Sequence, residues 1–424
     1  MEGDARSIDA ALLCHRRDDW LAAVKGQSKY VWGSERQARR NCYGLFQGLG
    51  SLEIFAGGSP VSAKGSGCDG AGWDWGRFEG TTVPYLGLAE LDKGSTGISG
   101  TTRSPETFVG GLSHRGRQGL FAMILNQAIM PDNKTVKGRK SWFFSDNNIL
   151  CLGSDIACDD AKHPIQTTLC QKTLRTDGQG AMRPTPLDGG DLAALPGQSV
   201  LDPTRPHWFL DVQQTGYHLP AGQNITLARK RQTSRDVDDL KDTQGDFLTA
   251  WIDHGVSPKG ASYEYLLVVR ANPALMQRVA AEPPYRVLRR DEAAHVVWGV
   301  ARRQWSCVFF RPQEVDPLAI GGETLPVKAV DRPCLAMADA MRDGQLDLSL
   351  ADPDLNLENQ ATKPRALRAT LRGAWKLQDA AGTICAWPVK DAKQKVRIVA
   401  AAADETTVEI DCEHGASYHL KLVR

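Results

Sequence analysis

The hydrophobic positions of this chain fall in short runs rather than in helical stripes. From Tyr30 onward, apolar stretches of about four to eight residues recur, each closed by Gly, Pro, Asn, Asp or Ser. This rhythm is typical of antiparallel strands joined by turns, and we predict an all-β protein. The clearest predicted strands are 51–55, 119–125, 148–152, 207–212, 263–269, 295–300 and 307–311.

One segment predicts a helix, and one region predicts a domain boundary. Residues 273–282 follow Asn272, a good N-cap residue, and are stopped by Pro283 and Pro284. Near 316–331, Pro and Gly interrupt the strands. We therefore expect two domains: a large antiparallel super-sandwich over 1–318 and a smaller C-terminal β-sandwich over 319–424.

The bulk composition excludes several classes of function. The 424 residues carry a net charge of +1, so no global field attracts nucleic acid. The sequence has no apolar run of the roughly 18 residues that a membrane helix needs, and its first residues lack a signal-peptide core. The 10 cysteines include no C-x-x-C pair, and we expect buried free thiols rather than a disulfide framework or a zinc site.

The candidate chemistry lies between Tyr30 and Thr82. A carboxylate, Glu35, stands beside the basic residues Arg36, Arg39 and Arg40 and just ahead of Asn41; farther along come Trp73, Asp74, Trp75, Arg77 and Glu79. Aromatic faces beside Arg, Asn and carboxylates suit a sugar-binding surface. The alternative is that Trp32, Trp73 and Trp75 are core residues with surface arginines nearby.

These motifs resemble the chondroitin sulfate ABC lyases of polysaccharide lyase family 8. The matching segments run in the same order over nearly the whole chain. They are WGSE at 32–35, NCYG at 41–44, GWDWGR at 72–77, GTT at 80–82, FSDNN at 144–148, LGSDI at 152–156, QTTL at 166–169, AWIDH at 250–254, ASYEY at 261–265 and PDLNL at 353–357.

The resemblance implies a glycosaminoglycan lyase that cleaves chondroitin or dermatan sulfate, with hyaluronan as a further substrate, by β-elimination at uronic acids. It gives Glu35 the place of the family's catalytic-site glutamate. We predict substrate contacts for Arg36, Arg40, Asn41, Trp73 and Arg77. By resemblance the protein is extracellular or periplasmic.

One part of the family's sequence has no counterpart in this chain. Family members carry a helical toroid ahead of the sheets, which supplies the catalytic His, Tyr and Arg, and its H-E-G-N-Y-P-G-Y segment has no counterpart here. We expect this chain to be the β-half alone, needing a helical domain or chain as partner and inactive without it. The alternative is a non-catalytic carbohydrate-binding or structural β-sandwich protein descended from such a lyase. The family's Arg and His become Leu45 and Leu49, which we expect to be core residues.

Three other constellations are weaker. Asp74 and Glu79 could form a glycosidase-like carboxylate pair, although carboxylates at this spacing are common by chance. The aspartates at 236, 238, 239 and 242 could hold calcium but lack an EF-hand pattern, so we expect no cofactor. Asp253 and His254 fall in a family strand motif, and we expect a structural role with His254 bonded to a carboxylate.

Overall fold

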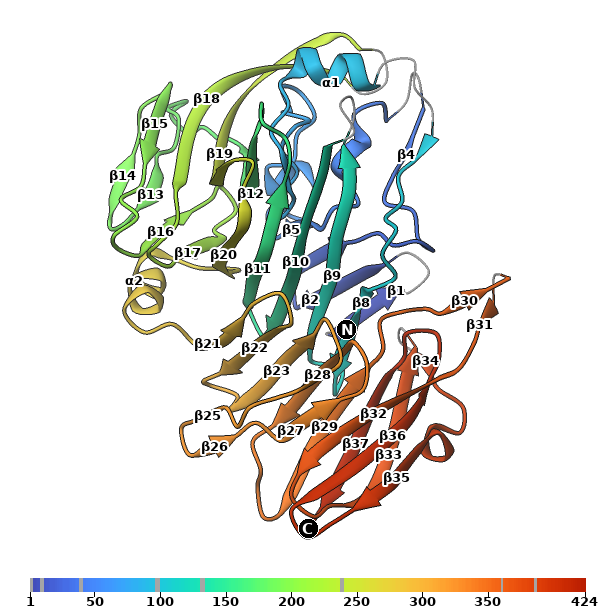
Figure 1. The fold of residues 1–424 in the computed structure, drawn as a ribbon. Coiled ribbons are helices and arrows are strands. Elements are labelled where there is room, and N and C mark those ends of the chain that lie inside the picture. The colour runs from blue at the N-terminus through green and yellow to red at the C-terminus, as the bar shows by residue number, and fades with distance from the viewer. Residues whose placement is uncertain are drawn as a thin grey trace.

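The computed structural model describes residues 3–7, 11–37, 41–95, 100–129, 134–236, 240–359, 361–384 and 387–424. Antiparallel sheets dominate it, as predicted, and they stack in layers (Figure 1). The large sheet has strand order β14-β13-β16-β17-β20-β11-β10-β9-β8. Its strands are β8 (Val109–His114), β9 (Gln118–Ile129), β10 (Lys134–Ser145), β11 (Asn148–Cys158), β13 (Thr185–Leu187), β14 (Gly190–Leu192), β16 (His207–Leu210), β17 (Gly216–Leu219) and β20 (Lys259–Val268).

Two sheets cover one side of the large sheet. The N-terminal sheet contains β1 (Gly3–Ser7), β2 (Leu12–Arg17), β3 (Trp20–Lys25) and β5 (Ser51–Phe55). The facing sheet contains β6 (Thr82–Pro84), β12 (Pro164–Thr173), β15 (Gly197–Val200), β18 (Ile225–Arg235) and β19 (Asp242–Val256).

Two further sheets form the C-terminal part. The long C-terminal sheet contains β21 (Tyr285–Arg290), β22 (Ala294–Gly299), β23 (Gln304–Phe309), β28 (Cys334–Asp339), β29 (Gln345–Ala351), β33 (Lys376–Ile384), β34 (Trp387–Pro388) and β37 (Ser417–Val423). The short C-terminal sheet contains β24 (Gln313–Glu314), β27 (Val327–Val330), β32 (Arg365–Arg372), β35 (Val396–Ala401) and β36 (Glu405–Cys412). Small ladders join β4 (Glu35–Arg36) to β7 (Gly100–Thr101), β25 (Ala319–Ile320) to β26 (Glu323–Thr324), and β30 (Leu357–Glu358) to β31 (Ala361–Thr362).

Side chains along each strand point alternately to opposite faces of the sheet, and this alternation explains the layering. On β10, Trp142 and Phe144 belong to the core beneath the facing and N-terminal sheets, whereas Phe143 belongs to the core on the opposite face. That second core also takes Val308 and Met337 from the long C-terminal sheet. Because alternate residues point to opposite faces, one strand supplies two cores. A third core lies between the two C-terminal sheets.

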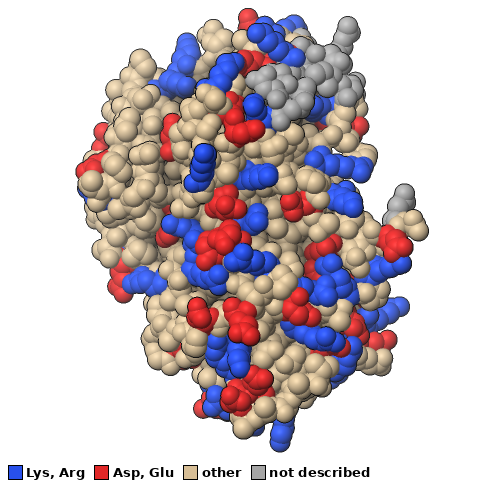
Figure 2. Space-filling view, in the orientation of Figure 1, with Lys and Arg blue, Asp and Glu red and all other residues tan. Residues whose placement is uncertain are grey.

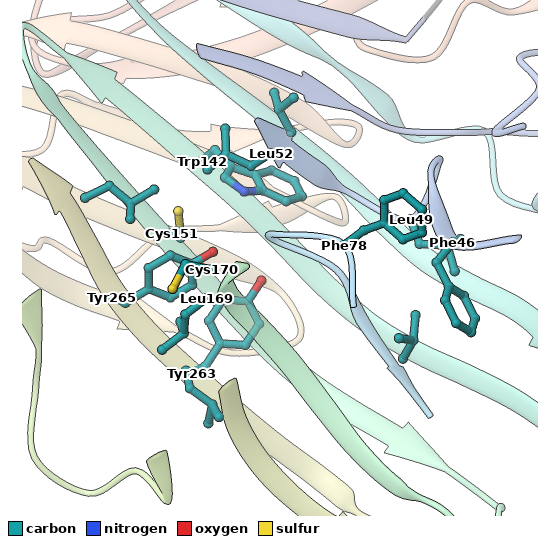
Figure 3. Close-up of a cluster of buried hydrophobic side chains, with 14 of the residues drawn as sticks. Phe46, Leu49, Leu52, Phe78, Trp142, Cys151, Leu169, Cys170, Tyr263 and Tyr265 are labelled. Atoms are coloured by element: carbon teal, nitrogen blue, oxygen red, sulfur yellow. The ribbon is translucent and has the colours of Figure 1, made fainter. Parts of the chain in front are cut away.

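The first of these cores holds several large side chains (Figure 3). Its members include Phe46, Leu49, Leu52, Phe78, Trp142, Cys151, Leu169, Cys170, Tyr263 and Tyr265. The burial of Leu45, Leu49 and Ile54 confirms that these positions pack rather than face solvent. The nine described cysteines are free, and most are buried, as expected; Cys385 lies outside the described residues.

The described residues form two α-helices, and both are short. Helix α2 (Pro273–Ala281) confirms the predicted helix, and the Asn272 side chain accepts a hydrogen bond from the Leu275 N–H at 2.9 Å. Helix α1 (Leu88–Ser95) was not predicted, because its sequence offers only Leu88 and Leu91 as an apolar pair and ends in Gly and Ser. Three 3-10 turns complete the elements: η1 (Gly44–Phe46), η2 (Lys64–Ser66) and η3 (Ala392–Lys395).

The predicted boundary at 318/319 stays a prediction. Strands from both sides of it share the long C-terminal sheet, since β23 pairs with β28 from Gln304↔Asp339 to Phe309↔Cys334. On the face drawn in Figure 2, basic and acidic side chains are intermixed over the sheets, in keeping with the net charge of +1.

Candidate active site

Glu35 lies on a short, anchored strand at the edge of the fold. It pairs with Thr101 across the β4–β7 ladder. The neighbouring Ser34 N–H donates to Thr102 Oγ1 at 3.0 Å, and the Thr102 N–H donates to the Ser34 carbonyl at 3.0 Å. The Glu35 side chain is exposed, and within the described part of the chain no hydrogen bond or ion pair engages its carboxylate. The backbone is therefore fixed while the acid faces solvent.

Asn41 supports this strand from the following loop. Its φ of 51° lies in the left-handed region, which Asn tolerates better than most residues. Its Nδ2 donates to the Glu35 carbonyl at 2.7 Å, and its amide forms two longer bonds with the Gln47 amide, at 3.2 and 3.3 Å. The geometry gives Asn41 a positioning role, and direct contact with substrate stays a prediction.

Of the basic residues near Glu35 that the structure describes, Arg36 is buried, Lys25 is half-buried and Lys29 is exposed. Arg36 is only 7% exposed, and burial lowers the pKa of its guanidinium. Lys25 donates to the carbonyls of Gly26 at 2.6 Å and Trp32 at 2.8 Å, and burial lowers its pKa to about 8. Lys29 is exposed. Arg40, like Arg39, lies outside the described residues.

Trp73 and Arg77 lie on one loop but in different surroundings. Trp73 is half-buried and meets Phe247 edge to face, with ring centroids 6.1 Å apart. Its indole N–H is buried and has no acceptor among the residues that the structure describes. Because part of the ring remains accessible, Trp73 stays a candidate for stacking on sugar.

Arg77 is an interior residue with 2% exposure. Its guanidinium lies between two aromatic rings, 4.1 Å from the centroid of Tyr85 and 3.9 Å from that of Trp251. It donates to Gln166 Oε1 at 2.8 Å and approaches Asp74 at 3.5 Å. Burial lowers its pKa, although Asp74 and Tyr85 act in the opposite direction. These contacts give Arg77 a structural role, and its predicted contact with substrate stays untested.

A second cluster links the loop around Asn41 to helix α1. The Tyr43 and Trp75 rings stack with centroids 5.7 Å apart. The Tyr43 hydroxyl donates to Asp92 Oδ1 at 2.5 Å, Arg235 pairs with Asp92 at 3.0 Å, and the Trp75 indole donates to the Arg235 carbonyl at 2.9 Å. Four segments distant in sequence are thereby held together beside the candidate site.

The sequence did not single out one exposed pair next to β4. Trp32 is 46% exposed, and the Arg103 guanidinium lies 5.1 Å from its ring centroid. The β4–β7 ladder brings Arg103 to this edge, and no local sequence pattern predicts that pairing. An exposed indole beside a guanidinium suits stacking on a sugar and binding of its anionic group.

Glu79 and His254, which belong to the weaker constellations, both have contacts inside the fold. Glu79 is buried, its Oε2 accepts from Lys172 Nζ at 2.8 Å, and burial raises its pKa to about 7. The expected bond from His254 to a carboxylate stays a prediction, and its Nε2 contacts the Thr167 hydroxyl at 2.8 Å. Burial lowers the His254 pKa to about 4. Within the described ranges, no group of three or more His, Cys, Asp or Glu residues is arranged to hold a metal ion.

The layered β architecture and the site motifs define a class of protein. Comparison with known proteins identifies that class. The model for polysaccharide lyase family 8, super-sandwich domain, matches residues 9–280. This chain belongs to polysaccharide lyase family 8.

Two curated relatives show the extent of the similarity. The chondroitin sulfate ABC endolyase of Proteus vulgaris is 29% identical over 384 residues, covering 86% of this chain and 35% of the relative. The chondroitin sulfate ABC exolyase of Bacteroides thetaiotaomicron is 30% identical over 429 residues, covering 96% and 40%. The chain thus spans well under half the length of these relatives.

Solved structures share the fold. A Paenibacillus xanthan lyase superposes with a TM-score of 0.78 at 17% identity, over 100% of this chain and 38% of that one. A chondroitin AC lyase of Streptomyces coelicolor A3 gives a TM-score of 0.73 at 20% identity, over 100% and 50%. Among the described residues, no helix has the length and apolar character needed to cross a membrane.

Proposed function

We propose that this chain is the β-sheet part of a lyase that cleaves a glycosaminoglycan by β-elimination at uronic acids. Chondroitin or dermatan sulfate is the proposed substrate, with hyaluronan as a further one. The observation that carries the proposal is the exposed Glu35 carboxylate on an anchored strand, at the position where the family motif has its glutamate. Family membership and the names of the relatives support the substrate class.

The chemistry requires more than one carboxylate. A uronate C5 proton becomes acidic only when the neighbouring carboxylate is neutralised and the enolate-like intermediate is stabilised. A base must remove that proton while an acid protonates the departing glycosidic oxygen at C4. Glu35 alone cannot fill these roles. We propose that it orients and tunes basic and phenolic groups supplied by a helical domain.

The proposed cleft wall combines predicted residues with newly recognised ones. Trp32 and Arg103 join Glu35 as exposed groups at one edge, and Arg103 is suited to bind a carboxylate or sulfate. Asn41 holds the Glu35 backbone in place. Arg36, Arg40 and Trp73 remain proposed substrate contacts, and Arg77 supports the wall from inside through Tyr85 and Trp251.

A non-catalytic carbohydrate-binding protein is the second candidate. The exposed Trp32–Arg103 pair favours it, because such a pair can bind sugar without any elimination chemistry. The changes at Leu45 and Leu49 do not favour it, since both side chains are buried and their replacement of Arg and His is a matter of packing.

The test is ultraviolet absorbance of the unsaturated uronate product. The chain is incubated with chondroitin sulfate, dermatan sulfate and hyaluronan, alone and mixed with the helical domain of a family 8 lyase. We expect absorbance to rise in the mixture only. Glu35→Gln should abolish the rise, because the amide cannot supply the negative charge.

Glu53→Gln is the matched control, since Glu53 is an exposed glutamate on β5, the next strand along the chain, which belongs to a different sheet from β4. This variant should retain the activity of the mixture. Product formed by this chain alone would contradict the requirement for a helical domain. Glycan binding without product in any mixture would favour the second candidate.

A further inference from the structure

Two histidines lie where the large sheet meets the long C-terminal sheet. Strand β8 packs there against β28, β29 and β37 (Figure 1). His114 on β8 is fully buried, and His419 on β37 keeps 21% of its side chain exposed. The Ser349 hydroxyl on β29 lies between them, 2.8 Å from His114 Nδ1 and 3.0 Å from His419 Nδ1. One hydroxyl therefore joins the two sheets through two imidazole rings.

The outer nitrogen of each ring faces a carboxylate. His114 Nε2 is 3.2 Å from Asp339 Oδ1, and His419 Nε2 is 3.5 Å from Asp347 Oδ1. Arg115 pairs with Asp339 at 2.8 Å and with Asp347 at 3.2 Å. Although burial acts in the opposite direction, hydrogen bonds from His114 and Arg115 hold the pKa of Asp339 well below its usual range. Asp339 therefore accepts hydrogen bonds and donates none.

A count of protons shows that this network is one proton short at neutral pH. Its four contacts run from Asp339 through His114, Ser349 and His419 to Asp347, and each contact needs one proton. Two neutral imidazoles and one hydroxyl supply three. The unfilled contact is the one between His419 Nε2 and Asp347, because 3.5 Å exceeds the length of an N–H···O bond. His419 then donates from Nδ1 to Ser349, which donates to His114.

We propose that these five residues form a pH-sensitive latch that takes up a single proton on acidification and then binds β8 more tightly to β29 and β37. The proton enters at His419 Nε2, beside Asp347, which lines an open hollow of about 820 Å³. The Nδ1 proton of His419 passes to Ser349 Oγ, and the Ser349 proton passes to His114 Nδ1. His114 becomes the cation, and His419 is again neutral with its proton on Nε2. All four contacts then hold a proton.

The charges around the latch limit it to one proton. A second proton would place two imidazolium ions with ring centroids only 5.5 Å apart. Burial lowers the pKa of His419 to about 4, and the charge of His114 acts in the same direction. Asp339 and Asp347 favour the first proton, and Arg115 opposes it. The remaining charged groups are Lys421, opposite Asp347 in the β29–β37 ladder, and Arg117, Arg302, Arg342 and Asp343 around the hollow.

NMR of the full chain labelled with nitrogen-15 in its histidines tests the latch, because ring-nitrogen shifts distinguish the two neutral tautomers from the cation. Between pH 8 and 5, we expect His114 to become cationic while His419 stays neutral and its proton moves from Nδ1 to Nε2. The Ser113 amide donates to Ser417 Oγ at 3.0 Å across the same contact. Its hydrogen-exchange protection, corrected for intrinsic rates, should rise about tenfold over this range. His414, exposed on a turn, is the internal reference.

Two variants interrupt the latch in different ways. Ser349→Ala removes the hydroxyl, so His419 should keep one tautomer from pH 8 to 5 and the gain in protection should vanish. Asp347→Asn offers an amide donor to His419 Nε2 and fills the fourth contact without an added proton, so His419 should keep its proton on Nδ1. Ser306→Ala, at a buried serine on β23 that bonds neither histidine, should behave as the wild type.

Any of four results would overturn the proposal. These are two cationic rings at pH 5, a neutral His114 at pH 5, the same His419 tautomer at pH 8 and pH 5, or a tautomer change that persists in Ser349→Ala. Protection of the Ser113 amide that does not rise on acidification would equally contradict the tighter attachment of β8.

Discussion

At the scale of single residues, two arginines over tryptophan rings make a matched pair. Arg77 lies 3.9 Å from the Trp251 centroid with 2% exposure, and Arg103 lies 5.1 Å from that of Trp32 in an exposed position. A planar guanidinium can stack on an aromatic ring and donate two parallel hydrogen bonds, which an ammonium group cannot do. The loss of unfolding free energy when Lys replaces such an arginine therefore depends on how deeply the side chain is buried.

We expect Arg77→Lys to lower the free energy of unfolding by about 1–3 kcal/mol, because the bond to Gln166 and both ring contacts are lost in the interior. Arg103→Lys should change it by less than about 0.5 kcal/mol. Urea denaturation measures both values. Equal effects of the two substitutions would show that Arg77 is not the interior support described above.

Lys140 is a fully buried cation without a carboxylate partner among the described residues. Its Nζ donates to the carbonyls of Leu49 at 3.1 Å and Gly80 at 2.6 Å, and burial lowers its pKa to about 7. Between that value and the unfolded pKa of 10.5, the unfolded chain binds the extra proton. Stability therefore rises with pH in this window, by up to roughly 1.4 kcal/mol per pH unit.

We expect Lys140→Met to remove this contribution to the slope of unfolding free energy between pH 7 and 10. Lys137→Met, an exposed substitution on the same strand β10, should keep the wild-type slope. Chemical denaturation at several pH values tests this. A slope in Lys140→Met equal to that of the wild type would mean that Lys140 stays protonated in the fold.

The sequence could predict the identity of the site residues better than their exposure. Motif order located Glu35, Trp73 and Arg77, but burial depends on which loops cover them. Arg77 is enclosed by Tyr85, which follows it closely, and by Trp251 from a distant strand. The Trp251 contact arises only from tertiary packing. The exposed Trp32–Arg103 pair was missed for the same reason.

At the scale of elements, strands were predictable and the short helix α1 was not. Besides the buried Leu91, polar contacts attach it: Glu90 contacts His163 Nε2 at 3.1 Å, and His163 Nδ1 contacts Asp160 at 2.7 Å. Lys162 also bonds Glu90. Such contacts leave no periodic apolar pattern, whereas α2 carries a cap and a proline stop that are local in sequence.

His163 should make the attachment of α1 depend on pH. Although burial by itself lowers it, the carboxylates of Asp160 and Glu90 raise the pKa of His163 above 6.5. The stabilisation is then complete below pH 6.5 and is lost as pH rises through the folded pKa. We expect hydrogen-exchange protection of the α1 amides, corrected for intrinsic rates, to fall as pH rises above 6.5.

His163→Gln should keep neutral hydrogen bonds and abolish this change in protection. His414→Gln, at an exposed histidine on a distant turn, should retain it. If α1 in His163→Gln still loosens with rising pH, another titrating group controls the helix, and the two carboxylates that contact His163 would be tested next.

At the scale of the whole molecule, the layers predict how the chain unfolds. The core between the large sheet and the long C-terminal sheet takes Leu120 and Phe143 from one side and Val308 and Met337 from the other. Strands on both sides of residue 318 also share one ladder. A continuous apolar layer should couple the predicted domains, so we expect one calorimetric unfolding transition.

Substitutions in separate cores test this coupling. Leu371→Ala, between the two C-terminal sheets, and Leu169→Ala, beneath the facing sheet, should each lower stability by about 2–5 kcal/mol and shift the single transition as a unit. Val399→Ala, at a 45% exposed position on β35, should shift it little. Two resolved transitions, with Leu371→Ala moving only one of them, would instead mean that the boundary at 318/319 separates independently folding units. The shared sheet and the central core would then stabilise each unit without linking them.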